Sequence, residues 1–92
     1  MLSRMARPVH IGSPLRSYTS GASRVEANGD TLDALLADLD RRYTGIRFRM
    51  IDEQNRIRPH IRIFINAREA RSLDESIEAG AEVHLVGALS GG

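Results

Sequence analysis

The sequence predicts an α+β fold in which one long helix packs across a mixed sheet of four or five strands. Two observations lead to this prediction. A single stretch carries leucines at helical spacing over several turns, and several shorter stretches alternate apolar and polar residues as strands do. A helix must bury its apolar stripe, and a sheet formed by 92 residues offers one face to cover it. The helix and the sheet are therefore expected to form the two layers of one small domain.

The N-terminal part of the chain predicts a hairpin. Residues 7–12 alternate, with Val9 and Ile11 on one face, and are expected to form the first strand. Leu15 is expected to turn back toward the core before a turn region rich in glycine and serine. Residues 23–27 then form a short second strand. Two strands joined by such a loop favour antiparallel pairing.

The clearest element in the sequence is a helix with five apolar residues on one face. Asp30 or Thr31 can cap its first turn by accepting hydrogen bonds from unpaired backbone N–H groups. Asp38 and Arg42 lie one turn apart and are expected to pair. Gly45 stands where a left-handed C-terminal cap belongs. The apolar face consists of Leu32, Leu35, Leu36, Leu39 and Tyr43.

Residues 46–51 leave two structures open. They alternate like a strand, yet the spacing of Phe48 and Ile51 also suits a helical turn. Residues 52–55 are expected to form a turn. Pro59 should stop any regular element, because proline lacks an N–H donor and restricts the residue before it.

The last third of the chain supplies two more strands. Residues 61–66 form the best strand of the sequence, with three isoleucines on one side. Residues 67–69 are expected to form a tight connection, and Leu73 and Ile77 are spaced for a short helical turn. Residues 83–86 form the final strand. We expect the core to consist of Val9, Ile11, Val25, Leu32, Leu35, Leu36, Leu39, Ile61, Ile63, Ile65, Leu73, Ile77, Val83 and Leu85.

The composition excludes several kinds of site and partner. The sequence has no cysteine, which rules out disulfides, thiolate catalysis and cysteine-ligated zinc. The net charge of +1 gives no strong footprint of nucleic-acid binding and leaves local basic patches open. The three histidines, His10, His60 and His84, are isolated and have no metal-ligand spacing, so no metal site is expected. No apolar run has the length of a membrane span and residues 1–7 lack the apolar part of a secretory signal, so a cytoplasmic protein is expected.

The chain ends on a small, glycine-rich segment directly after the last expected strand. Residues 89–92 read Leu-Ser-Gly-Gly. Glycine has no Cβ and adopts backbone angles that other residues avoid, so two terminal glycines can extend through a narrow channel. We therefore expect residues 1–88 to form the domain and residues 89–92 to form a flexible tail that it presents. A frayed terminus or an expression scar is the alternative.

Five short pieces of sequence follow one another in a characteristic order. They are Gly29-Asp30-Thr31-Leu32 before the helix, Tyr43-Thr44-Gly45 after it, Ile63-Phe64-Ile65-Asn66 in a strand, Ala79-Gly80-Ala81-Glu82-Val83 before the last strand, and Ala88-Leu89-Ser90-Gly91-Gly92 at the end. In this order they resemble the ubiquitin-like β-grasp sulfur carriers of the MoaD and ThiS family, from Val9 to Gly92. The resemblance implies a β-grasp fold with a C-terminal Gly-Gly tail.

Two stretches depart from the family pattern. The family usually has Asn-Gly-Glu or Asn-Gly-Asp after the central strand, whereas Ala67 and Arg68 follow Asn66, so a different turn is expected there. Residues 56–60 are longer and more basic than in the shortest members. They are similar to the CysO- and QbsE-like branch, whose carriers serve cysteine or secondary-metabolite synthesis. Molybdopterin, thiamin, cysteine and thio-metabolite pathways all remain open.

The resemblance implies that this protein is a cosubstrate and not an enzyme. A ubiquitin-activating-type adenylyltransferase of the MoeB and ThiF kind would adenylate the carboxylate of Gly92, using ATP and magnesium. A sulfur donor would then displace AMP and leave a thiocarboxylate for a sulfur-accepting synthase. Gly91, Ser90 and Leu89 would present this end, and the chain itself would bind no cofactor.

The sheet face opposite the helix is expected to carry Arg62, Phe64, His84 and Val86. Phe64 and Val86, if exposed together, would form a docking patch for the activating enzyme and the sulfur acceptor. The alternative is a single exposed aromatic ring covered by neighbouring arginine stems. The arginines at positions 47, 49, 56, 58 and 62 would meet an acidic partner surface or form a solvated face.

Three other functions compete with a sulfur carrier. The first is a protein modifier joined through Gly92 to other proteins, which shares the same chemistry up to the acceptor. The second is an RNA-binding β-grasp module, which requires a clustered basic face and leaves the Gly-Gly end unexplained. The third is an enzyme, but the sequence offers no nucleophile–base pair, metal-ligand set or phosphate-binding loop.

Overall fold

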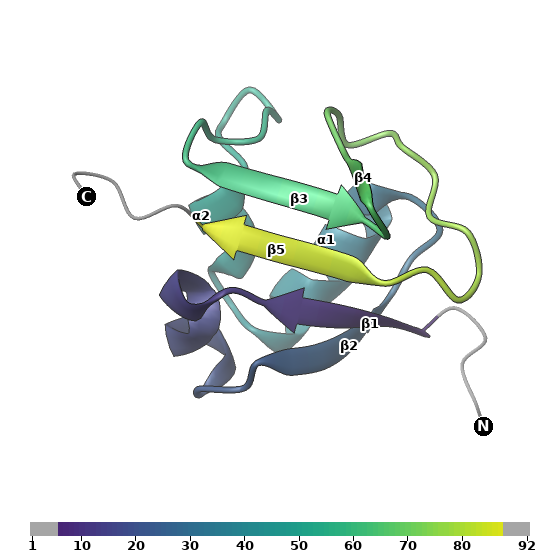
Figure 1. The fold of residues 1–92 in the computed structure, drawn as a ribbon. Helices are drawn as coiled ribbons and strands as arrows, with labels where there is room; N and C mark the ends of the chain where they lie inside the picture. Colours follow the sequence, from purple (N-terminus) through teal and green to yellow (C-terminus); the bar gives the residue numbers. More distant parts are fainter. Residues whose placement is uncertain (1–5, 88–92) are drawn as a thin grey trace.

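The computed structural model describes residues 6–87 and shows one mixed five-stranded sheet with a helix packed across one face (Figure 1). The strands are β1 (Ala6–Ile11), β2 (Arg24–Asn28), β3 (Ile61–Ile65), β4 (Arg68–Glu69) and β5 (Val83–Gly87). The helices are the 3-10 helix η1 (Ser13–Thr19) and the α-helices α1 (Leu32–Arg42) and α2 (Ile46–Met50). Among the described residues, no helix has the length and apolar character needed to cross a membrane.

The first and last strands lie side by side in the middle of the sheet. Its strand order is β2-β1-β5-β3-β4. β1 and β5 pair in parallel, with Val9 opposite Val83, whereas β2 and β3 pair antiparallel to them on either side. The α+β prediction is therefore confirmed, with five strands and the expected antiparallel hairpin at the start.

The core lies between the sheet and α1 and agrees closely with the prediction. Every residue of the predicted core is buried except Leu73, which is partly buried. Leu15 turns back into the core as expected. The buried apolar residues that the predicted core did not contain, besides Leu15, are Ala27, Ile46, Met50, Ile51, Ala70 and Ala81.

The ends of α1 agree with the prediction at one end and differ at the other. The Thr31 hydroxyl accepts a hydrogen bond from the Ala34 N–H at 3.2 Å, so Thr31 is the N-cap. At the other end Tyr43 is the C-cap, and Gly45 instead begins α2 with a φ of 97°. Gly45 therefore has the predicted left-handed conformation, but the prediction that it caps α1 was wrong. Asp40 satisfies the start of α2 by accepting from the Gly45 N–H at 3.0 Å.

The segment between β4 and β5 was predicted to contain a short helical turn at Leu73 and Ile77, and this was wrong. Residues 72–74 form a bend and turn, and Ser76 makes an isolated bridge to Thr31. The carbonyls of Leu73 and Glu75 accept hydrogen bonds from the first two N–H groups of α1, at 2.8 and 2.9 Å. These carbonyls are therefore not available to build a helix of their own.

The segment after β3 also differs from the prediction. Asn66 and Ala67 form the turn, with Asn66 at a φ of 54°, and residues 68–69 pair with β3 as the short strand β4. Residues 67–69 were expected to form only a tight connection, but they supply half of the turn and all of β4 in a hairpin with β3. Asn66 adopts the left-handed conformation at low cost, which explains how the turn forms without the glycine that usually follows.

Candidate functional site: the exposed sheet face and the end of β5

The face of the sheet opposite α1 carries the four residues that the sequence analysis singled out for docking. Arg62 lies opposite Val86 and Phe64 opposite His84 in the antiparallel pairing of β3 with β5. The residues between them on both strands point into the core and are buried. Strand alternation therefore fixes this docking face, which we define as Arg62, Phe64, His84 and Val86.

The docking face exposes apolar surface next to positive charge. Val86 is 41% exposed, Phe64 is partly buried and Arg62 is exposed. Only two large apolar side chains of the described residues are exposed, and Val86 is one of them. An apolar centre with a charged neighbour is the composition of a protein-binding surface.

The second exposed apolar side chain is Phe48 on α2, which the sequence analysis did not single out. It is 60% exposed, and the guanidinium carbon of Arg58 lies 4.6 Å from its ring centroid. The Nε of Arg58 also donates to the Phe48 carbonyl at 2.8 Å. Ile46 and Met50 are buried one turn apart, so Phe48 between them faces outward. Knowledge that residues 46–50 are helical would have revealed this exposure.

The basic stretch noted in the sequence does not form one patch of free charge. An Arg47 guanidinium nitrogen lies 3.1 Å from an Asp33 carboxylate oxygen, and Arg56 lies 3.7 Å from Asp52. Arg58 is engaged with Phe48 as described above. Three of the five arginines thus have partners on the same molecule. This favours a solvated face over a surface that binds an acidic partner for this part of the chain.

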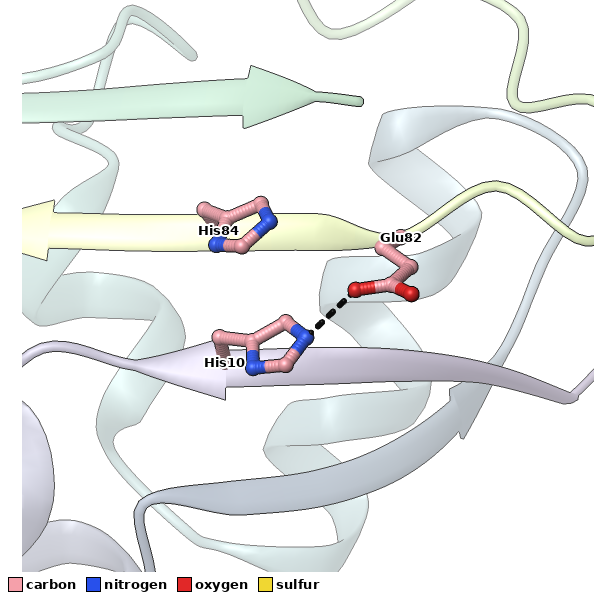
Figure 2. A group of neighbouring side chains, drawn as sticks. All are labelled: His10, Glu82 and His84. Carbon is pink, nitrogen blue, oxygen red and sulfur yellow. Dashed lines mark hydrogen bonds and ion pairs between the residues drawn. The ribbon is translucent and has the colours of Figure 1, made fainter. Parts of the chain in front are cut away.

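Two histidines and a glutamate meet on the exposed face where β1 and β5 lie side by side (Figure 2). The rings of His10 and His84 stack with centroids 4.4 Å apart and planes 9° apart. The Nε2 of His10 lies 2.7 Å from a carboxylate oxygen of Glu82. The prediction that these histidines are isolated was wrong, because parallel pairing of β1 with β5 joins residues that are distant in sequence. His60 stands apart from them beside Phe48 and Arg58.

The end of β5 is held tightly by the start of η1. The Gly12 N–H donates to the Leu85 carbonyl at 2.8 Å, and a Cβ on Gly12 would lie 2.8 Å from that same oxygen. Gly87 packs against Pro14 and lies opposite Ile61, the first residue of β3. The chain therefore reaches Gly87 as part of the central strand of the sheet, which is paired with β1 on one side and β3 on the other. The predicted tail residues Leu89, Ser90, Gly91 and Gly92 lie outside the described residues.

These features together define a class of protein. A mixed sheet with parallel first and last strands, a helix across one face and an exposed opposite face is the arrangement of ubiquitin-like β-grasp proteins. The sequence model of the ThiS family matches residues 9–92, and the chain belongs to the ThiS family.

Individual relatives agree with this assignment. The sulfur carrier protein CysO of Mycobacterium tuberculosis (strain ATCC 25618 / H37Rv) is 35% identical over 89 residues, which cover 91% of this chain and 96% of the relative. The crystal structure of Mycobacterium tuberculosis CysO matches with a TM-score of 0.83 and 31% identity, over 89% of this chain and 98% of that chain. A chain of the Amycolatopsis orientalis BexX/CysO complex matches with a TM-score of 0.84 and 27% identity, over 92% and 98% of the two chains.

Proposed function

We propose that this protein is a sulfur carrier whose C-terminal Gly92 is activated and converted to a thiocarboxylate. The single observation that carries the proposal is the match to the ThiS family, which extends through the terminal Gly91-Gly92. The similarity to CysO, a sulfur carrier protein, supports the same conclusion. On this proposal the protein is a cosubstrate of other enzymes.

The chemistry begins with a carboxylate that is a poor electrophile. The Gly92 carboxylate attacks the α-phosphate of ATP on a MoeB- or ThiF-like adenylyltransferase with magnesium, and pyrophosphate leaves. A sulfur donor then attacks the acyl carbon, and AMP leaves with the oxygen that it was bonded to. The product is a thiocarboxylate at Gly92 that an acceptor synthase can consume. Gly91 and Gly92 let this end enter a narrow active site because they have no side chains.

We propose that the docking face is where the activating enzyme and the sulfur acceptor bind in turn. Its position supports this role, because β5 both contributes His84 and Val86 and leads directly into the tail. A CysO protein forms a complex with BexX in Amycolatopsis orientalis, so a relative of this fold binds a partner protein. A partner that grips the sheet face would hold the end of β5 at a fixed distance from its own active site.

The adenylation step can be tested separately from sulfur transfer. With an activating enzyme of this family, the intact chain should support exchange of labelled pyrophosphate into ATP. A chain with one alanine added after Gly92 keeps the fold and the two glycines but moves the carboxylate off Gly92, and it should support little exchange. Equal exchange by both chains would show that Gly92 is not the activated residue.

A protein modifier is the alternative use of the same activated end. The two functions separate after adenylation. A carrier accumulates a thiocarboxylate when sulfide is supplied, whereas a modifier forms covalent conjugates of higher mass with other proteins. The family match and the CysO relatives favour the carrier.

A further inference from the structure

His84 belongs to the docking face, but none of His10, Glu82 and His84 takes part in the chemical steps of adenylation and sulfur transfer proposed above. One potential ligand atom from each of the three residues lies within 4.8 Å of the other two. We propose that these side chains form a binding site for a divalent transition-metal ion, with Zn²⁺ as the representative ion. The site lies on the exposed face of the sheet, at the seam between β1 and β5 (Figure 2).

The donor set determines the class of ion. Two imidazole nitrogens and one carboxylate oxygen are ligands that zinc and its neighbours in the first transition row accept. Magnesium and calcium prefer sites built from oxygen ligands alone, so they are poor candidates. Three protein ligands leave the fourth tetrahedral position of zinc open to water or to a group from a partner.

The backbone places the three residues in advance. His10 and His84 are direct register partners in the parallel pair of β1 and β5, so their side chains leave the same face side by side. Glu82 comes two residues before His84 and is anchored by Asn66: the Asn66 N–H donates to the Glu82 carbonyl at 2.7 Å, and the Glu82 N–H donates to the Asn66 side-chain oxygen at 3.0 Å. A metal site whose backbone is already ordered loses little conformational freedom when the ion binds.

Only side-chain rotation separates the observed geometry from coordination. His10 Nε2 and the Glu82 carboxylate oxygen are 2.7 Å apart in a hydrogen bond, which an ion would replace. With bonds of about 2.0 Å, tetrahedral ligands lie roughly 3.3 Å from each other. The stacked rings of His10 and His84 must therefore tilt toward a common point. Both rings are partly exposed, so the tilt does not disturb the core.

The surroundings leave room for the ion and provide balancing charge. A hollow of about 190 Å³ borders both histidines, together with Gly12 and Val86, and Glu82 does not line it. Glu82 is about half exposed and supplies the negative charge that offsets part of the ion's charge. Arg16 also lines the hollow, and its Nε donates to the Ile11 carbonyl at 2.8 Å. The partial exposure of His10 and His84, with the half-exposed Glu82, leaves the open position accessible to solvent.

Zinc titration of the untagged chain followed by calorimetry tests the proposal, because the sequence provides a matched control for each ligand. We expect one Zn²⁺ per chain. His10→Gln, Glu82→Gln and His84→Gln should each weaken binding by at least about tenfold. His60→Gln removes the third histidine of the sequence, which lies outside the cluster, and should leave the affinity unchanged. Circular dichroism on each variant shows whether the fold is retained.

Three results would overturn the proposal. They are an absence of zinc binding by the intact chain, an equal loss with His60→Gln, and a stoichiometry of one ion per two chains. If the intact chain does not bind zinc, the cluster is only a hydrogen bond between His10 and Glu82 with the ring of His84 stacked on that of His10. The titration uses the isolated chain and no activating enzyme, so its outcome does not depend on the sulfur-carrier proposal.

Discussion

Gly12 is the residue on which the joint between η1 and the end of β5 depends. Its backbone N–H donates to the Leu85 carbonyl, and a Cβ at this position would lie 2.8 Å from that oxygen. The contact would join the new Cβ to a backbone oxygen, so no side-chain rotation can relieve it. Gly12→Ala should therefore lower the free energy of unfolding by about 1 to 3 kcal/mol, measured by urea denaturation.

Gly87→Ala is the matched control at the other side of the same joint. The three atoms nearest to a Cβ there would be side-chain atoms of Pro14 and Ile61, the closest at 3.4 Å. The loss of chain entropy in the unfolded state favours alanine by about 0.4 to 1 kcal/mol, so the control should be neutral or slightly stabilising. Similar destabilisation by both substitutions would contradict the assigned role of the Gly12 contact.

Asp38 connects α1 to β2 and makes the stability of the fold depend on pH. Burial raises the pKa of Asp38, but hydrogen bonds from the Asn28 N–H and the Arg42 side chain, with the charges of Arg42 and Arg41, outweigh it. The pKa is held below its ordinary value of 3.8. The ionised carboxylate therefore stabilises the fold above pH 3.8, and this contribution is lost as the pH falls through the lowered pKa.

Asp38→Asn tests this dependence directly. The substitution should cost about 1 to 3 kcal/mol at pH 7, because it removes charge-assisted hydrogen bonds from a buried site. The difference from the parent chain should shrink as the pH falls from 3.8 through the lowered pKa, where the carboxyl of the folded parent becomes protonated as well. Glu53→Gln, at an exposed turn position, should leave stability unchanged. A cost for Asp38→Asn that is independent of pH would show that the charge has no part in it.

At the scale of elements, α1 depends on its N-cap. Thr31→Ala removes the oxygen that accepts from the Ala34 N–H and should cost about 1 kcal/mol in thermal or chemical unfolding. Thr31→Ser keeps the hydroxyl and should restore most of the loss. If serine and alanine are equally destabilising, the methyl group of Thr31 and not its hydroxyl supports the helix start.

Local pattern predicted most elements, and tertiary contacts decided the rest. Leucine periodicity was sufficient for α1, and alternation was sufficient for β1, β3 and β5, because each buries one regular face. Residues 46–50 are too few for a period to distinguish helix from strand, and Asp40 on the preceding helix caps their first turn. β4 has two residues and exists through its pairing with β3, which no local signal reports.

The candidate site was predictable to the extent that it follows from strand alternation. Arg62, Phe64, His84 and Val86 were assigned to one face from alternation, and the structure places them there. Contact between His10 and His84 was missed, although each was on a recognised strand. It requires the parallel pairing of the first and last strands in one specific register. Aligning the buried faces of the two strands restricts the register only to shifts of two residues, so the contact did not follow from the pattern.

At the scale of the whole molecule, the docking face and the tail should act together. Val86→Arg places a second charge at the apolar centre of the face and should lower kcat/KM for adenylation by at least about tenfold through KM. Phe48→Arg, a charge placed on the other exposed apolar side chain, should have little effect because α2 is not part of the docking face. The check is steady-state kinetics with the chain as the varied substrate. A larger defect for Phe48→Arg would move the docking site to α2.

The measurement that tests the central proposal most directly is the intact mass of the chain after incubation with ATP, an activating enzyme and sulfide. The proposal predicts replacement of one terminal oxygen by sulfur, located at Gly92 by fragmentation. A chain that ends at Ser90 should show no change under the same conditions. An unmodified intact chain, with an enzyme that converts a known carrier in parallel, would contradict the sulfur-carrier function.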